Sequence, residues 1–134
     1  MAAPIPEPIR TFLEQPNLAV LVTQSPSGRL QATPVWFTLS DGHILINTKA
    51  GRVKLRNMKA NPRVALAVVD REDPYRYVQI QGAVANFDAA NGPKDIDRLS
   101  QRYRGKPYAY PADDHPRNRI SIYIAPEKIS AMGV

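Results

Sequence analysis

The chain has 134 residues, of which 43% are hydrophobic and 22% charged, which is typical of one globular domain spanning residues 1–134. It contains no cysteine, which excludes disulfide frameworks, thiolate metal sites and thiol nucleophiles. Eighteen basic and twelve acidic residues give a net charge of +6, a balance that suits an anionic small molecule, a nucleic acid or an anionic surface.

The N-terminal half predicts one short helix and three strands. Turn residues separate these elements, and hydrophobic periodicity places them at residues 7–14, 18–23, 29–39 and 43–48. The run at 18–23 is continuously apolar, which favours a strand buried on both faces. Pro34 cannot donate a ladder hydrogen bond, so the strand that contains it must have an edge, a bulge or a bend there.

The C-terminal half predicts two helices and three further strands. A basic helix follows Thr48 and stops at Asn61-Pro62, and a second helix begins near Asn91 and ends at Gly105. The predicted strands cover residues 64–69, 77–87 and 119–124, and residues 129–132 could continue the last of them beyond Pro126. Residues 106–118 form a proline-rich loop of the length typical of a lid or a partner contact.

Hairpin connections dominate this order of elements, and the helices are inserted between strands instead of alternating with them. That pattern indicates a mainly β fold with α additions, and we predict a small six-stranded antiparallel barrel.

The passage from the third strand into the basic helix is the most informative segment. Arg52, Lys54 and Arg56 fall in the first turns of that helix. Free backbone N–H groups and the helix macrodipole already make this end positive, so cations there are unfavourable unless an anion neutralises them. A phosphate is the natural ligand for such a cluster. The alternative is a solvated basic helix without a ligand.

Other kinds of site have little support. His43 and His115 lack a second ligand at a metal-binding spacing, so we expect neither a metal site nor a Ser–His–Asp triad. The sequence contains no run of about eighteen apolar residues, so we expect no membrane-spanning segment. The first residues lack the pattern of a signal peptide, and we expect a cytoplasmic location.

Several segments resemble a known family. These are Thr33-Pro34-Val35-Trp36-Phe37, Thr48-Lys49-Ala50-Gly51-Arg52-Val53-Lys54-Leu55-Arg56-Asn57, Asn61-Pro62-Arg63-Val64-Ala65-Leu66 and Val78-Gln79-Ile80-Gln81-Gly82. Over residues 7–132 the chain resembles the pyridoxamine-phosphate-oxidase-like flavin and deazaflavin proteins, which have an FMN-binding split β-barrel fold. Within that family it is most similar to the small coenzyme F420-dependent reductases.

The resemblance implies a homodimer with two cofactor sites at the subunit interface. It places the flavin-type ring near Pro34, Val35 and Trp36, and the phosphate at Arg52 and Lys54. The cofactor-binding residues that it implies are Thr33, Pro34, Val35, Trp36, Asn47, Thr48, Gly51, Arg52, Lys54, Arg56 and, from the neighbouring subunit, Tyr77. It assigns no catalytic residue.

The implied activity is hydride transfer from a reduced deazaflavin to a small unsaturated or quinone-like acceptor. The chain ends at Val134 without the Trp- and Arg-bearing segment of true pyridoxamine-phosphate oxidases, which argues against vitamin B6 oxidation. Coenzyme F420 carries more negative charge than FMN, and Lys49, Lys59 and Arg63 would widen the basic surface that meets it. We therefore predict F420, with FMN as the alternative.

Two other functions are open. The protein could carry or sequester a flavin or deazaflavin without turnover, or its basic stripe and tyrosines could bind single-stranded nucleic acid, a partner that we do not expect. Tyr108 and Tyr110 are candidate proton donors or packing residues. Trp36 could contact the ring or fill the core. Arg119 could bind the cofactor tail or pair with a carboxylate such as Asp114.

Overall fold

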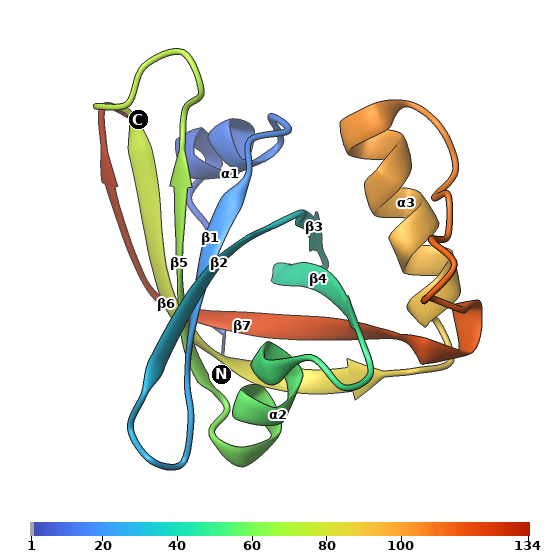
Figure 1. Cartoon of the computed structure of the whole chain (residues 1–134). Coiled ribbons are helices and arrows are strands. Elements are labelled where there is room, and N and C mark those ends of the chain that lie inside the picture. The colour runs from blue at the N-terminus through green and yellow to red at the C-terminus, as the bar shows by residue number, and fades with distance from the viewer. Residues whose placement is uncertain (1) are drawn as a thin grey trace.

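The computed structural model describes residues 2–134. In chain order the elements are α1 (Glu7–Leu13), β1 (Ala19–Gln24), β2 (Leu30–Val35), β3 (Thr38–Ser40), β4 (His43–Lys49), α2 (Val53–Ala60), β5 (Arg63–Val69), β6 (Tyr77–Asp88), α3 (Gly92–Arg104), the short 3-10 helix η1 (Pro116–Asn118) and β7 (Arg119–Met132) (Figure 1). Within these residues, none of the helices combines the length and apolar character needed to cross a membrane.

The strands form one antiparallel sheet in the order β2-β1-β5-β6-β7-β4-β3. The prediction of a mainly β fold with α additions is confirmed, but the strand number was wrong: there are seven strands in residues 2–134, not six. The expected strand at 29–39 is interrupted at Trp36 and Phe37 and becomes β2 and β3. Residues 129–132 belong to β7, which continues through Pro126.

The interruption at Trp36 and Phe37 joins the two ends of the sheet. β2 and β3 are the first and last strands in the sheet order, yet only two residues separate them along the chain. The sheet must therefore curl until its edges approach each other, although no strand pairing closes it between β2 and β3. Pro34 lies in the edge strand β2, opposite Val20, as its missing N–H group requires.

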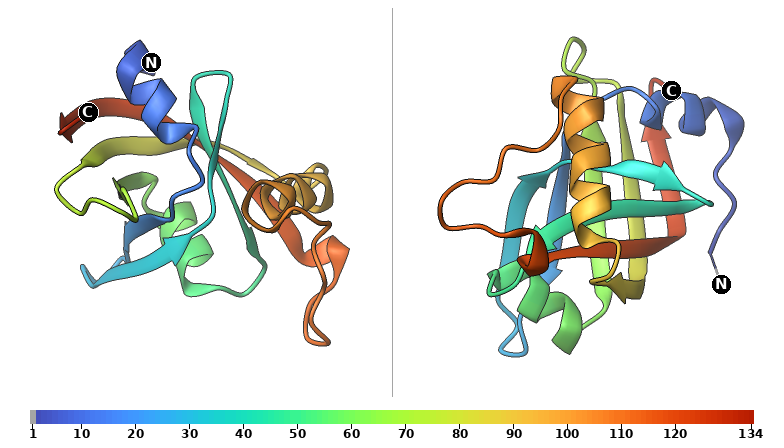
Figure 2. Two further views of the ribbon diagram at one scale, coloured as in Figure 1. Left: turned by 90° about the horizontal axis from the view of Figure 1, so that it is seen from above. Right: turned by 90° about the vertical axis from the view of Figure 1, so that its right-hand side faces the viewer.

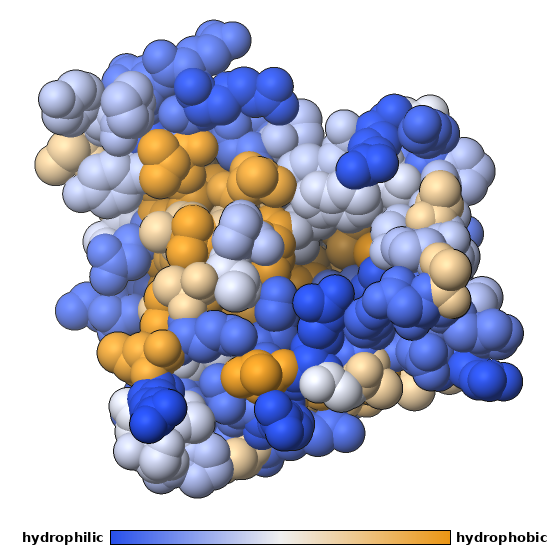
Figure 3. Space-filling model, in the orientation of Figure 1, coloured by the Kyte–Doolittle hydropathy of each residue, from blue (hydrophilic) through white to orange (hydrophobic). Residues whose placement is uncertain are grey.

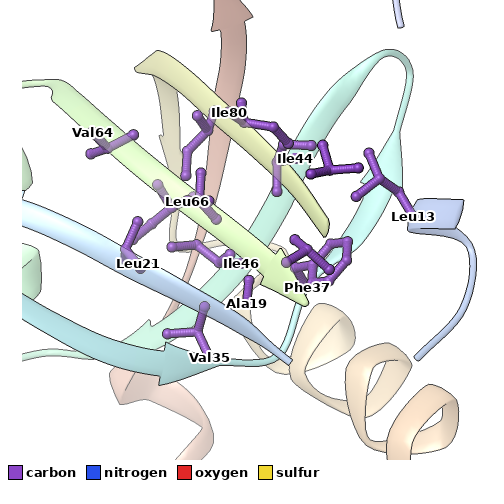
Figure 4. Packing of buried hydrophobic residues seen from close by; sticks show 14 of the residues in the cluster. Leu13, Ala19, Leu21, Val35, Phe37, Ile44, Ile46, Val64, Leu66 and Ile80 are labelled. Atoms are coloured by element: carbon purple, nitrogen blue, oxygen red, sulfur yellow. The ribbon is translucent and has the colours of Figure 1, made fainter. Parts of the chain in front are cut away.

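One hydrophobic core fills the inside of the curled sheet. Leu21, Leu66 and Ile80 project into it from neighbouring strands, and Leu13 of α1 covers one end (Figure 4). Phe12 of α1 is buried in the same core. The expectation that residues 18–23 are buried on both faces was wrong. Burial alternates along β1, because its outer face lies outside the core, and 39% of Val20 is exposed.

Two helices are fixed to the sheet by specific contacts. On α2, the buried Asn57 amide donates a 3.0 Å hydrogen bond to the Thr23 hydroxyl of β1. α3 lies across β4 and β7 (Figure 2). Its first residue, Gly92, sits so close to the Arg119 carbonyl of β7 that a Cβ atom there would overlap it. α3 ends at Gly105, whose φ of 73° gives the left-handed cap that the sequence predicts.

Candidate cofactor-binding site

A groove opens where the β2–β3 interruption, the β4–α2 turn and α3 meet. Its volume is about 420 Å³, within the range of small-molecule sites. We call it the Trp36–Lys54 groove, and it is lined by Leu18, Pro34, Val35, Trp36, Asn47, Thr48, Arg52, Lys54, Ile96, Leu99, Tyr108 and Arg119. In Figure 3, hydrophobic residues gather over β1 and β5, and hydrophilic residues lie between this area and α2.

Most of the residues implied by the resemblance line this groove. Pro34, Val35 and Trp36 come from one wall, and Asn47, Thr48, Arg52 and Lys54 come from the β4–α2 side. Residues 37–46 separate these two segments in the sequence, and the curl of the sheet brings them to the same groove.

Four implied residues do not line the groove: Thr33, Gly51, Arg56 and Tyr77. Thr33 directly precedes the lining residues, and its buried hydroxyl has no hydrogen-bond partner within residues 2–134. Gly51 adopts a φ of 91°, which allows the turn into α2. Arg56 is exposed on α2, and Tyr77 begins β6 opposite Val69 of β5.

Two of the three cations that line the groove have no ion-pair partner within residues 2–134. Arg52 and Lys54 form no ion pair with any of residues 2–134. The first turn of α2 contains no acidic residue, and no side chain caps its N-terminus. Burial, and to a lesser extent the charge of Arg52, lowers the pKa of the half-buried Lys54. An anion bound here would offset both the repulsion between Arg52 and Lys54 and the loss of solvation of the Lys54 ammonium group.

Two other cations of the basic segment are already paired. Lys49 Nζ lies 3.1 Å from Asp113 Oδ2 of the proline-rich loop. Arg63 Nη2 lies 3.8 Å from Glu127 Oε1. The uncompensated charge is thus concentrated at Arg52 and Lys54 instead of extending evenly along the segment.

Arg119 forms the polar end of the groove. This buried guanidinium lies 3.1 Å from Asp114 Oδ2, and it donates a 2.7 Å hydrogen bond to the Tyr108 hydroxyl. Its Nη1 also donates to Asn47 Oδ1 over 3.4 Å. Of the two roles that the sequence left open for Arg119, pairing with a carboxylate is therefore observed. The same contacts hold Tyr108 at the groove, whereas Tyr110 packs edge-on against Tyr108 outside it.

Sequence reasoning did not assign five of the lining residues to the site. Ile96 and Leu99 are buried residues of α3, and they close one side of the groove. Leu18 belonged to the run expected to be buried. Tyr108 and Arg119 were considered as candidates but not included, because no local pattern places residues 108 and 119 beside Asn47.

Comparisons with known proteins identify the family of the chain. Residues 5–133 match the family model described as pyridoxamine 5'-phosphate oxidase, so the chain belongs to that family. A solved structure of an F420 reductase is 32% identical, with a TM-score of 0.83 and coverage of 94% of this chain and 98% of that one. No curated protein matched the sequence.

Two more distant structures share the fold. A conserved hypothetical protein from Mycobacterium tuberculosis has a TM-score of 0.75 at 23% identity and covers 98% of this chain and 86% of its own. General stress protein 26 from Bacillus anthracis has a TM-score of 0.70 at 20% identity, with coverage of 94% and 92%.

Proposed function

We propose that this protein is an oxidoreductase that binds coenzyme F420 in the Trp36–Lys54 groove. In this proposal it catalyses hydride transfer from the reduced cofactor to a small unsaturated or quinone-like acceptor. The observation that carries the proposal is the unpaired Arg52 and Lys54 at the N-terminus of α2, directly beside an apolar wall.

The residues present fit such a cofactor. Arg52 and Lys54 would hold its phosphate, together with the free N–H groups of the first turn of α2. Trp36, Pro34 and Leu18 offer an apolar surface to a flat ring, and Asn47 and Thr48 offer polar groups to its edge. When bound, a deazaflavin supplies two-electron hydride chemistry, and the chain has to orient it, exclude water and admit the acceptor.

F420 is preferred to FMN for two reasons. Its phosphodiester and glutamate tail carry more negative charge than FMN, and the cations at the start of α2 have no acidic residue in their turn. The similarity to an F420 reductase over nearly the whole chain adds independent support. FMN remains the alternative cofactor, since its phosphate would meet the same two cations.

A homodimer is part of the proposal. Val22, Leu30 and Ala65 line a hollow of mixed character together with the charged Arg63, Glu127 and Lys128, and 72% of Leu30 is exposed. The family resemblance implies that a second copy places its Tyr77 at the cofactor site. Sedimentation velocity tests this: we expect a dimer that dissociates in Leu30→Glu, and a monomeric wild-type protein would contradict it.

Binding of the cofactor can be followed through Trp36, the one tryptophan of the chain. We expect F420 to quench its fluorescence and to bind more tightly than FMN. Lys54→Ala should weaken F420 binding at least about tenfold, because it removes a charge-assisted contact to phosphate. The exposed Lys94 on α3 provides the matched control, and Lys94→Ala should leave affinity unchanged.

Other outcomes separate the alternatives. Equal affinity in Lys54→Ala and wild type would overturn the assignment of the phosphate site. Tight binding without oxidation of reduced F420 by any quinone or enone would favour a carrier. Strongly salt-dependent binding of oligonucleotides, without cofactor binding, would favour the nucleic-acid alternative.

A further inference from the structure

The carboxamide of Asn47 has a fixed orientation in the Trp36–Lys54 groove. Asn47 lies in β4 and lines the groove together with Arg119 of β7. Its Nδ2 donates a 2.9 Å hydrogen bond to the carbonyl oxygen of Gly92 in α3, and a carbonyl can only accept. Arg119 Nη1 lies 3.4 Å from Asn47 Oδ1, and a guanidinium can only donate. The two partners therefore place the carboxamide nitrogen at Gly92 and the carboxamide oxygen at Arg119.

A hydrogen-bond chain behind the groove enforces the same orientation. Ser121 lies directly opposite Asn47 in the pairing of β4 with β7. The buried Ser121 hydroxyl faces two acceptors, Asp95 Oδ2 at 2.6 Å and the Asn91 carbonyl oxygen at 3.3 Å. Because these acceptors engage its only proton, the Ser121 oxygen is left to accept from Asn47 Nδ2, which lies 3.4 Å away. Both N–H groups of the Asn47 side chain are thus engaged within the fold.

Asn47 consequently offers a ligand an acceptor and no donor. Its Oδ1 receives one hydrogen bond within residues 2–134, the 3.4 Å contact from Arg119, and a carboxamide oxygen has room for two. The neighbouring Arg119 offers donors, because each of its terminal nitrogens carries two N–H groups. One of these on Nη1 meets Asn47, and one on Nη2 meets the Tyr108 hydroxyl. This end of the groove therefore presents an acceptor and a donor side by side.

Ligand groups differ in how well they match this pair. A group that only accepts, such as a phenolate or a carboxylate, would satisfy Arg119 but would leave Asn47 Oδ1 facing another oxygen. An imide edge, in which one N–H stands between two carbonyls, offers a donor to Asn47 and an acceptor to Arg119. The rings of FMN and F420 both carry such an edge.

We propose that Asn47 is the residue that recognises the imide edge of the ring. Its Oδ1 accepts the imide N–H, and Arg119 donates to one of the adjoining ring carbonyls. Asp95 serves as a positioning residue, since it acts on Asn47 through Ser121 and does not line the groove. That the imide belongs to a redox cofactor rests on the proposed function.

Methylation of the imide nitrogen tests this contact. One probe is 7,8-didemethyl-8-hydroxy-5-deazariboflavin, which is the F420 chromophore without its phosphate, and the other is the same compound methylated at the imide nitrogen. Quenching of Trp36 fluorescence measures the affinity of the full-length protein for each probe. We expect the unmethylated probe to bind at least about tenfold more tightly, because the methyl group removes the donor and leaves Asn47 Oδ1 unpaired.

Substitution of Asn47 should abolish the preference between the two probes. In Asn47→Leu the ratio of the two affinities should fall to about one, because neither probe then finds an acceptor at this position. The exposed Asn86 of β6 lies outside the groove and provides the matched control, so Asn86→Leu should keep the wild-type ratio. Far-UV circular dichroism checks the fold of each variant, and Asn47→Ala replaces Asn47→Leu if the leucine variant does not fold.

Lys54→Ala separates this inference from the proposed function. Because neither probe carries a phosphate, this variant should leave their ratio unchanged while it weakens binding of intact F420. Failure of F420 and FMN to bind the wild-type protein, with the preference between the probes retained, would overturn the proposed function and keep the imide contact. Tight binding of F420 with equal affinity for the two probes would overturn the inference and keep the proposed function.

Two other results would also overturn the inference. A preference for the unmethylated probe that persists in Asn47→Leu would mean that a different group accepts the imide N–H. Absence of measurable binding of either probe to the wild-type protein would mean that the groove does not recognise the ring itself.

Discussion

The indole of Trp36 and the phenol of Tyr103 are stacked, with ring centres 5.4 Å apart and planes inclined by 7°. Trp36 lies where β2 gives way to β3, and Tyr103 lies in the last turn of α3. The stack therefore fixes the position of α3 relative to the open side of the sheet. It also holds the indole in place at the Trp36–Lys54 groove, which the indole lines.

Tyr103→Phe should lower the free energy of unfolding by about 1–2 kcal/mol at neutral pH. The Tyr103 hydroxyl donates a 2.7 Å hydrogen bond to the Asn17 carbonyl, and the substitution removes this bond while preserving the stack. Urea unfolding of both proteins measures the difference. Unfolding curves that coincide at pH 7 would show that the Tyr103 hydroxyl does not contribute to stability.

The difference in unfolding free energy between wild type and Tyr103→Phe should also depend on pH. Burial raises the pKa of Tyr103 above its ordinary value of 10.0, although hydrogen bonding at Phe37 and the nearby Arg102 oppose the shift. The neutral form is favoured in the folded state, so its contribution is complete below pH 10.0 and is lost as the pH rises through the folded-state pKa. The stability difference between wild type and Tyr103→Phe should shrink over that alkaline range. A difference that grows above pH 10.0 would contradict this sign.

Lys54→Met should stabilise the ligand-free protein while weakening F420 binding. The pKa of Lys54 is lowered, so the folded state disfavours its charge, and this cost is present at neutral pH and disappears as the pH rises past the lowered value. Since the Lys54 side chain keeps some contact with solvent, the expected gain is below about 1 kcal/mol. Thermal unfolding with and without F420 measures both effects, and a destabilised ligand-free variant would be the opposite result.

Asn57→Ala should destabilise the protein by about 1–3 kcal/mol, because it leaves the buried Thr23 hydroxyl without its partner. A double-mutant cycle with Thr23→Val isolates the contact between α2 and β1. The coupling should be clearly favourable, and additive effects of the two substitutions would show that the hydrogen bond does not fix α2. Far-UV circular dichroism confirms that each variant retains the fold.

Arg119→Met should destabilise the protein by about 3–5 kcal/mol, because the buried Asp114 carboxylate would lose its only cationic partner within residues 2–134. The Asp114 side chain is 1% exposed, so water cannot compensate for the loss. Adding Asp114→Leu should restore much of the stability. Limited proteolysis within residues 106–118 provides a second measurement, since release of Asp114 and Tyr108 frees this loop. Equal stability of the single and double variants would contradict the prediction.

Local patterns identified the elements well. The helix expected from Asn91 to Gly105 is α3, Gly92–Arg104, because its apolar period and its glycine cap are both encoded within a few residues. The strand expected at 43–48 is β4, His43–Lys49, for the same reason. The cation cluster at Arg52 and Lys54 was also evident, since charge at a helix N-terminus is a local feature.

Long-range relations were not available from local patterns. The pairing of Asn47 with Ser121 between β4 and β7 brings Arg119 to Asn47, and nothing near either residue specifies it. An apolar run such as 18–23 looks the same whether its outer face meets a core, a ligand or a second chain. That is why the exposure of Val20 was missed. The role of Tyr77 from a neighbouring subunit stays a prediction.

The two-residue bridge at Trp36 and Phe37 has a consequence for how the molecule assembles. Its flanking strands lie at opposite ends of the sheet, and β4 pairs with β7 so that Lys49 lies opposite Arg119, which is far along the chain. Such remote partners make folding slow, on the order of milliseconds to seconds. During refolding, cofactor binding should therefore recover later than the backbone circular dichroism signal. The time course of cofactor binding would then report when the native structure is complete.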